Sequence, residues 1–155
     1  MTRPPTTAAT ALDTSALTRA LYAADASLYR VVPQAVARPL AVDDLHALVE
    51  LARREHLPLT MRGAGTSCAG NAVGPGLVID TSRHLDQVLA LNADTATATV
   101  HPGVVHARLQ RAATPHGLRF GPDPSTHSRC TIGGMIGNNA CGPRALGYGR
   151  TADNI

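Results

Sequence analysis

The sequence predicts an α+β domain, and three observations lead to that fold class. The first is size and composition: 155 residues suffice for one domain, and 44% apolar against 16% charged residues allow a packed core. The second is the order of the candidate elements (strand, helix, strand, hairpin, helix and strand), which favours α+β over a doubly wound sheet. The third is small side chains: 26 residues are Ala, one is Phe and none is Trp, so a thin core must bring backbones close together.

Two helices and a set of extended segments are expected in the N-terminal half. A short amphipathic helix is expected over 13–24, followed by extended chain around 31–36. The strongest helical pattern covers 43–56, because apolar residues recur every three or four positions, at Leu45, Leu48, Val49 and Ala52. Strands are expected over 57–61, which begins near a proline, and over 77–80, which is entirely apolar up to its final Asp.

The C-terminal half is expected to begin with a hairpin. Its strands are 88–91 and 96–101, in which Thr and Val alternate. A helix follows over 103–112 and is closed by Gly117, and 118–120 is expected to form one more strand. Beyond that point the chain is rich in glycine and turn residues, so we expect turns there.

The two ends of the chain are expected to differ from its middle. Residues 1–12 are rich in Thr, Ala and Pro and predict a disordered leader, which leaves 13–155 as the domain. Residues 148–155 end where another strand would start, so the domain is expected to be incomplete at its C-terminus.

Composition excludes several classes of function. The chain has no Lys, which rules out Walker-type phosphate loops, Schiff bases and protein-kinase chemistry. The 14 Arg residues are scattered, which argues against a nucleic-acid surface, and no apolar run approaches the length of a transmembrane segment. Three widely spaced cysteines without a CxxC pair argue against a disulfide framework or a zinc site, and favour a reducing cytoplasm.

Two glycine-rich segments are the candidate ligand-binding loops. The first, 63–70, follows a predicted strand, and its small residues let several backbone N–H groups approach one phosphate. It fails the dinucleotide fingerprint, because Cys68 stands where the third Gly is required, and it fails the P-loop pattern, because Asn71 stands in place of Lys. The second, 133–142, holds four Gly and two Asn. Together they predict an elongated ligand such as a dinucleotide lying between them, although both remain open to interpretation as structural turns.

Five motifs in matching order carry a family resemblance. They resemble the FAD-binding domain of the vanillyl-alcohol oxidase / p-cresol methylhydroxylase (PCMH) type, in which small mixed sheets are flanked by helices. Within that family the chain is most similar to FAD-linked D-2-hydroxy-acid dehydrogenases of the D-lactate, glycolate and D-2-hydroxyglutarate type. The motifs are Arg62–Gly70, Pro102–Val104, Gly121–Ser125, Cys130–Gly142 and Tyr148–Gly149.

The resemblance implies cofactor-binding roles for particular residues, grouped by the part of FAD that each would contact. The FAD pyrophosphate would be held by Arg62, Gly63, Ala64, Gly65, Thr66, Ser67, Gly70 and Asn71, and the cofactor cleft would be lined by Pro102 and Gly103. The ribityl chain, the other side of the pyrophosphate and the flavin edge would contact Pro122, Asp123, Ser125, Thr131, Gly133, Gly134, Gly137, Asn138 and Gly142, and the adenine would lie near Ile155.

The resemblance also implies an activity and its missing parts. The intact protein would oxidise a small D-2-hydroxy acid to the 2-oxo acid and pass electrons to an acceptor that the sequence leaves open; an iron–sulfur region of the longer members is one candidate. Some members attach FAD covalently through a His in the first loop, but no His lies between His56 and His84, so non-covalent FAD is implied. In this family the substrate half lies beyond the residues present here, so no catalytic residue and no metal ligand is identified, and the chain alone is expected to be inactive. The alternative is a non-catalytic nucleotide-binding or interaction module that retains the fold.

Overall fold

Residues 12–155 are described by a computed structural model, in which the chain divides into two units. The N-terminal unit extends to Leu85 and the C-terminal unit begins at Asp86. The leader expected at residues 1–12 lies outside the described residues except for Leu12. The single domain expected over 13–155 stays a prediction.

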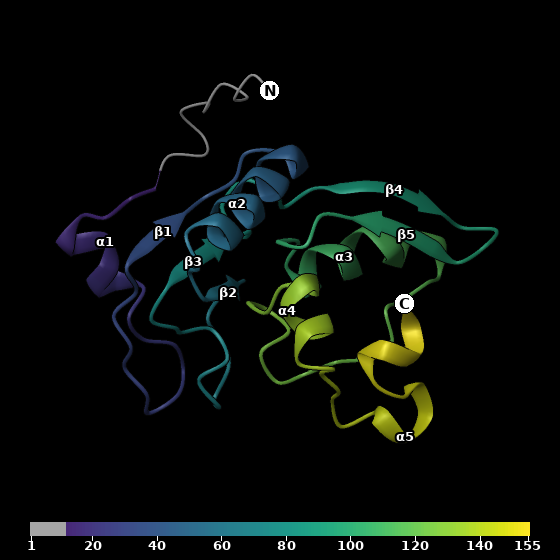
Figure 1. Cartoon of the computed structure of the whole chain (residues 1–155). Helices are drawn as coiled ribbons and strands as arrows, with labels where there is room; N and C mark the ends of the chain where they lie inside the picture. The colour runs from purple at the N-terminus through teal and green to yellow at the C-terminus, as the bar shows by residue number, and fades with distance from the viewer. Residues whose placement is uncertain (1–11) are drawn as a thin grey trace. The chain divides into compact units, whose positions relative to one another are not determined.

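A parallel three-stranded sheet forms the centre of the N-terminal unit. Its strands are β1 (Ala35–Ala37), β2 (Leu59–Arg62) and β3 (Leu77–Asp80), in the order β1-β3-β2. Helix α2 (Val42–Arg54) connects β1 to β2 and lies against one face of the sheet (Figure 1), where Leu48 and Ala52 pack on small and branched strand residues. Strand β1 contributes only Ala to this interface, so its side chains there are small, as the Ala-rich composition predicts.

A tyrosine fastens the N-terminal segment to the other side of this sheet. Helix α1 (Ala16–Leu21) begins after Ser15, whose hydroxyl accepts from the Thr18 N–H, and ends before Tyr22. The Tyr22 ring is 5% exposed and packs with Val36 and Val78, while its hydroxyl donates to the buried Asp80 carboxylate. The other oxygen of Asp80 accepts from the N–H and the hydroxyl of Ser82, at 2.8 and 2.6 Å. Both oxygens of the buried Asp80 carboxylate therefore accept hydrogen bonds, as buried polar groups in proteins usually do.

The C-terminal unit has its own sheet and its own core. Strands β4 (Val88–Asn92) and β5 (Thr97–Val100) form an antiparallel hairpin, and α3 (His106–Ala113) continues through a 3-10 turn, η2 (Thr114–His116), to Gly117, which is left-handed with φ of 69°. Three further short helical segments follow: α4 (Ile132–Gly137), α5 (Ala145–Tyr148) and η3 (Thr151–Asn154). The core consists of Val104, Leu109, Cys130, Ile132 and Met135.

The small parallel and antiparallel sheets with flanking helices confirm the α+β class, and two segments differ from the prediction. The strand expected over 118–120 is wrong, because no neighbouring strand pairs with it and its backbone bonds to side chains of α3 instead. The turns expected in the second glycine-rich segment are partly wrong, because 132–137 forms α4. The helix begins there because the Thr131 hydroxyl accepts from the Gly134 N–H, as an N-cap residue does.

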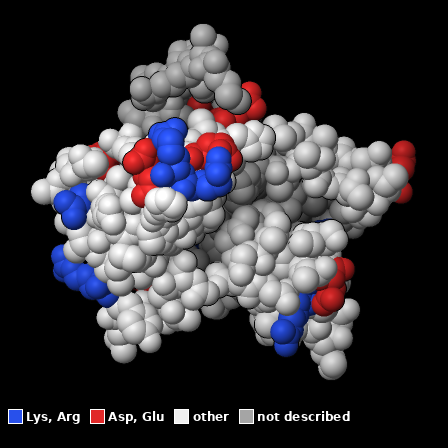
Figure 2. Space-filling model, viewed as in Figure 1, with Lys and Arg blue, Asp and Glu red and all other residues white. Residues whose placement is uncertain are grey.

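Charged side chains pair locally on the surface of α2. Arg53 contacts Glu50 at 2.8 Å and Arg54 contacts Glu55 at 3.0 Å, so basic and acidic groups lie intermingled over this helix (Figure 2). None of the helices described between residues 12 and 155 has the length and apolar character needed to cross a membrane.

We expect Tyr22→Phe to lower the free energy of unfolding by about 1–3 kcal/mol, because the buried Asp80 carboxylate then loses a donor that no water can replace. Urea denaturation followed by circular dichroism measures this change. Tyr29→Phe is the matched control, since the Tyr29 side chain is 62% exposed. Equal effects of the two substitutions would show that the hydroxyl of Tyr22 does not hold Asp80.

Candidate functional site

The first glycine-rich segment starts at the carboxyl end of β2. In parallel sheets ligands bind outside the carboxyl ends of the strands, so the position itself favours a binding role. Strand β2 ends at Arg62, which lies in register with Asp80 at the end of the neighbouring β3. The segment then runs to β3 without forming a helix or strand of its own, so other contacts must fix its shape.

The Arg62 side chain supplies those contacts from inside the loop. Its guanidinium donates to the carbonyls of Ala72, at 2.9 Å, and Ala24, at 3.0 Å. It also lies 5.2 Å from the centre of the Tyr22 ring, a favourable cation–π position. Arg62 therefore joins both ends of the loop to the segment after α1. Its predicted role as a pyrophosphate ligand stays a prediction, and these side-chain donors are already bonded within the unit.

Gly65 is required because the loop turns directly over this guanidinium. Its φ is +67°, and a Cβ atom there would lie 2.6 Å from an Arg62 nitrogen. Its carbonyl accepts from the Ala26 N–H at 3.1 Å, which ties the loop a second time to the segment after α1. Any larger residue must both adopt a disfavoured conformation and displace Arg62.

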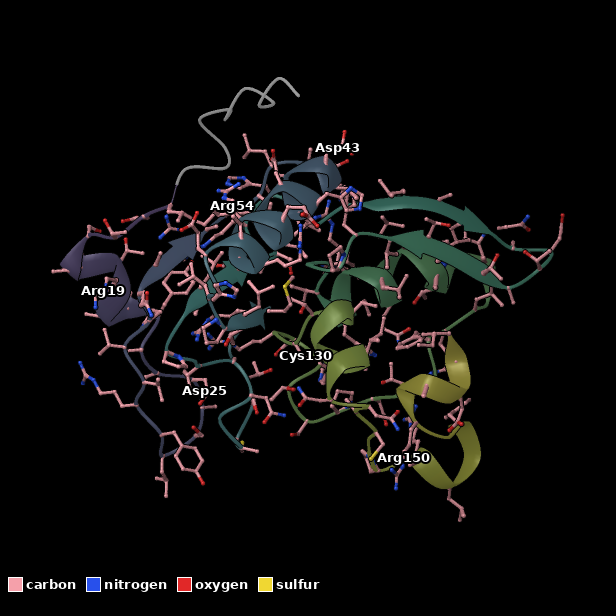
Figure 3. The ribbon with its side chains drawn as sticks, in the orientation of Figure 1. Arg19, Asp25, Asp43, Arg54, Cys130 and Arg150 are labelled. Atoms are coloured by element: carbon pink, nitrogen blue, oxygen red, sulfur yellow. The ribbon has the colours of Figure 1, made fainter. Side chains whose placement is uncertain are left out.

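Two polar side chains hold the second half of the loop. The Ser67 hydroxyl accepts from the N–H groups of Ala69 and Asn71, at 3.2 and 3.3 Å. Asp25, labelled in Figure 3, accepts from the Ala72 N–H at 3.2 Å. Burial opposes the charge of the Asp25 carboxyl, but hydrogen bonds from Ser27 and Ala72 and the nearby Arg62 outweigh it and lower its pKa. The carboxylate therefore stays ionised and keeps the loop closed at neutral pH.

The middle of the loop keeps its backbone donors available. Within the described part of the chain, the N–H groups of residues 64–68 make no hydrogen bond, while the residues on either side are fixed. Consecutive N–H groups in a turn of small residues form a concave donor surface of the kind that binds phosphate oxygens. These donors have the chemistry that an anionic group such as a pyrophosphate requires, and the contact predicted for Gly63 to Asn71 stays a prediction.

The second glycine-rich segment is built differently. The N–H of Gly133 donates to the Pro102 carbonyl at 2.8 Å, and the N–H of Gly134 donates to the Thr131 hydroxyl at 3.3 Å. A Cβ atom at Gly133 would lie 2.7 Å from Pro102, so this glycine permits close packing of two predicted cofactor residues. The backbone donors predicted to reach the cofactor from these two positions are thus used within the C-terminal unit, and their contact with it stays a prediction.

A second pair of predicted residues also meets in this unit. Asp123 lies against Gly142 so closely that a Cβ atom at Gly142 would overlap the Asp123 backbone. The Asp123 carboxylate pairs with the Arg144 guanidinium at 3.3 Å and accepts from the Arg144 N–H at 3.4 Å. Ile155 is 73% exposed at the end of η3, whose Thr151 donates to the Ala140 carbonyl. The groove expected between the two glycine-rich segments spans both units and stays a prediction.

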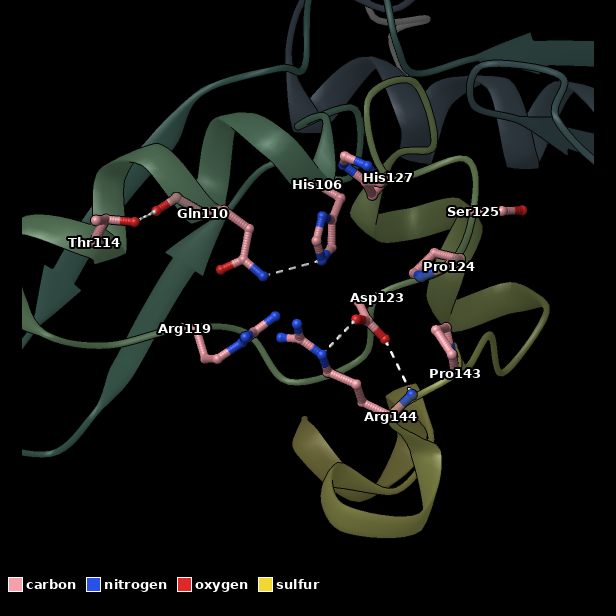
Figure 4. Close-up of a pocket in the computed structure, with 10 residues that line it drawn as sticks. All are labelled: His106, Gln110, Thr114, Arg119, Asp123, Pro124, Ser125, His127, Pro143 and Arg144. Carbon is pink, nitrogen blue, oxygen red and sulfur yellow. Dashed lines mark hydrogen bonds and ion pairs between the residues drawn. The ribbon is translucent and has the colours of Figure 1, made fainter.

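Asp123 also lines a pocket of about 610 Å³ within the C-terminal unit (Figure 4). Its wall includes two histidines and two arginines that the sequence analysis did not assign to a site: His106, His127, Arg119 and Arg144. Arg119 lies 5.3 Å from the Tyr148 ring centre and, among residues 12–155, forms no ion pair. One of these residues could have been found from the sequence: His106 lies at i, i+4 spacing from Gln110 on a predicted helix, so the two side chains share one face.

The cysteines are not arranged for chemistry. Burial raises the pKa of the Cys130 thiol, which lies in the core, and Cys68 and Cys141 are exposed. No disulfide joins the three, and residues 12–155 contain no group of three or more metal-ligating side chains.

Comparison with known proteins identifies the family of the chain. Residues 33–155 match the FAD binding domain family. The chain is 39% identical over 141 residues to a D-2-hydroxyglutarate dehydrogenase of Pseudomonas putida, covering 89% of this chain and 14% of that protein. It is 35% identical over 145 residues to the glycolate oxidase subunit GlcD of Bacillus subtilis, covering 92% of this chain and 31% of that one.

The fold is also that of a solved structure. A structure of an alkyldihydroxyacetonephosphate synthase superposes with a TM-score of 0.81 over 92% of this chain and 29% of that one, at 22% identity. This likeness concerns the fold, which is the PCMH type that the motifs resemble. Since the matched family model covers residues 33–155, which is most of the chain, the chain belongs to the FAD binding domain family.

Proposed function

We propose that this chain is the FAD-binding part of an enzyme that oxidises a D-2-hydroxy acid to the corresponding 2-oxo acid. The observation that carries the proposal is the row of backbone N–H groups at 64–68, which have no hydrogen-bond partner within the described residues. Their neighbours are held by Arg62, Ser67 and Asp25, so the donors are preorganised. A fixed set of donors is what binding of a pyrophosphate requires, because little conformational entropy is lost on binding.

The remaining predicted residues divide by what they offer to the cofactor. The first loop would contact the pyrophosphate through Gly63, Ala64, Gly65, Thr66, Ser67, Gly70 and Asn71. Small or fixed residues of the C-terminal unit offer close approach to the ribityl chain and flavin edge: Pro102, Gly103, Pro122, Asp123, Ser125, Thr131, Gly133, Gly134, Gly137, Asn138 and Gly142. We place Ile155 near the adenine. Bound FAD would supply the acceptor for the hydride equivalent of the hydroxy acid.

The substrate class is supported by the names of the relatives. D-2-hydroxyglutarate and glycolate are both 2-hydroxy acids, and the chain is 39% and 35% identical to proteins named for them. Binding is proposed to be non-covalent, since the first loop contains no His. A reducing cytoplasm is proposed from the three unpaired cysteines. The electron acceptor is left open, with an iron–sulfur region of the full-length protein as one candidate.

Direct flavin binding tests the proposal. The purified chain is expected to bind FAD, with quenching of flavin fluorescence on titration, and to release it unchanged when the protein is denatured. FMN, which lacks the pyrophosphate bridge and adenosine, should bind at least about tenfold more weakly, because the donors at 64–68 then lose their bridging phosphate. A chain that ignores FAD and binds another nucleotide would instead be the non-catalytic module.

Gly65→Ala should weaken FAD binding by about tenfold or more, because the new Cβ displaces Arg62 and with it the row of donors. Gly117→Ala is a matched control: its φ is +69°, so the backbone strain is the same, but nothing lies within 4 Å of the added Cβ. Gly117→Ala should lose about 1 kcal/mol of stability in urea unfolding, and Gly65→Ala should lose at least as much, because its Cβ also meets Arg62. Equal FAD affinities in the two variants would show that the first loop does not hold the pyrophosphate.

The chain with FAD bound is expected to show no turnover of D-lactate, glycolate or D-2-hydroxyglutarate in a dye-reduction assay. The reason is length, since the chain spans 14% and 31% of the named relatives. Dye reduction above the rate of free FAD would place a complete active site within these 155 residues.

A further inference from the structure

Helix α3 holds a neighbouring backbone segment through the side chain of Gln110. The Gln110 Oε1 accepts from the Phe120 N–H at 3.1 Å, and its Nε2 donates to the Phe120 carbonyl at 2.7 Å. A side-chain amide thus makes both hydrogen bonds that a neighbouring strand would have made. Residues 118–120 have the sequence pattern of a strand. The backbone of Phe120 nevertheless needs no strand beside it, because Gln110 supplies both hydrogen bonds.

His106, one turn earlier on α3, holds the same segment two residues further on. Its Nε2 lies 2.8 Å from the Pro122 carbonyl. A carbonyl only accepts, so the 2.8 Å contact assigns the proton to Nε2 and the lone pair to Nδ1, and the Gln110 Nε2, 3.2 Å from the same ring nitrogen, then finds no acceptor there. Nδ1 is buried and, within the described residues, has no hydrogen-bond partner. Because the whole side chain is 2% exposed, this lone pair cannot reach a substrate, which excludes a general-base role for His106.

The two side chains lie one turn apart on α3 and hold backbone groups two residues apart, since Gln110 bonds to Phe120 and His106 contacts Pro122. Pro122 has no N–H, so its carbonyl is the only polar backbone group that requires a partner there.

Asp123 follows immediately, and its position depends on this contact. Its carboxylate pairs with Arg144, and its backbone lies against Gly142, so a shift of Pro122 would disturb both. We propose that His106 and Gln110 are positioning residues for the cofactor, because they fix the Phe120–Pro122 backbone and thereby place Asp123. The inference rests on the proposed binding of FAD.

Protonation of His106 would oppose this arrangement. A second proton would sit on Nδ1, in a buried place with no acceptor among residues 12–155. The groups facing the ring are His127, with ring centres 6.1 Å apart, Arg119 and Asp123. Burial lowers the pKa of His106, and the nearby His127 and Arg119 lower it further. The Pro122 carbonyl and Asp123 act in the opposite direction but do not outweigh burial. The neutral form is therefore the folded form, and stability is lost as the pH falls below the ordinary value of about 6.5.

The test measures FAD affinity and melting temperature on the same variants. Gln110→Leu, which removes both bonds to Phe120, should raise the FAD Kd by about tenfold. Gln110→Glu is a second variant of the same shape, which keeps the acceptor, loses the donor and should also weaken binding. Leu109→Val is the control: Leu109 lies on α3 in the core but makes no contact of this kind, so its Kd should stay within about twofold of wild type although its melting temperature falls.

The pH profile separates positioning from general support. Wild-type affinity should fall as the pH is lowered from 7.5 to 5.5. His106→Gln places an amide nitrogen near the position of Nε2. It should therefore keep most of the wild-type FAD affinity at pH 7.5 and lose no affinity as the pH is lowered. His106→Leu should weaken FAD binding at every pH. His127→Asn, which leaves the bond to Pro122 intact, should keep the fall.

Three results would overturn the inference, and they are distinguishable. If Gln110→Leu and Gln110→Glu bind FAD like wild type, the contact positions nothing, while the proposed function stands. If Leu109→Val loses as much FAD affinity per degree of lowered melting temperature as the Gln110 variants do, the effect of the Gln110 variants is one of stability alone. If the wild-type chain itself does not bind FAD, the proposed function fails and this inference fails with it.

Discussion

The buried carboxylate of Asp80 is the constraint from which the N-terminal unit is organised. It lies at the carboxyl end of the central strand, where a charge without partners would be costly. Tyr22 and Ser82 satisfy it, and the Tyr22 ring in turn lies beside the guanidinium of Arg62. Arg62 joins both ends of the first glycine-rich loop to the segment after α1. Through Tyr22 and Arg62 this carboxylate contributes to the shape of the loop, together with Ser67 and Asp25.

The two glycine-rich segments use glycine for different purposes. In the first, Gly65 lets the backbone turn over a side chain and leaves a row of N–H groups unbonded within the described residues. In the second, Gly133 and Gly142 let the backbone approach Pro102 and Asp123 closely, and the N–H of Gly133 is used in packing. Similar composition therefore gives a loop with unbonded N–H groups in one unit and a tightly packed segment in the other.

The parts of the fold that could be predicted are those determined by local periodicity. Helix α2 and the β4–β5 hairpin follow directly from the spacing of their apolar residues. Helix α4 could not be predicted, because Gly at 133, 134 and 137 opposes helix formation and only the cap at Thr131 and the contact with Pro102 compensate.

The site shows the same limit. The position of the first loop could be predicted from the sequence, and the family resemblance named its residues and those of the second segment. The partners of Arg62 and the contact of His106 with Pro122 join residues distant in the chain, so no local pattern reports them.

The exclusive use of arginine has a consequence for altering this protein. Arg38 uses three different nitrogens on Tyr22, Asp13 and Thr18, and Arg62 spans two carbonyls from one planar group. An ammonium group is compact and cannot span such partners, so replacement by lysine keeps the charge but not the geometry. Exchanging arginine for lysine, a common way to improve expression or to introduce amine-labelling positions, is therefore safe in this chain only at solvent-facing sites such as Arg53 and Arg54, where the side chains are 76% and 64% exposed.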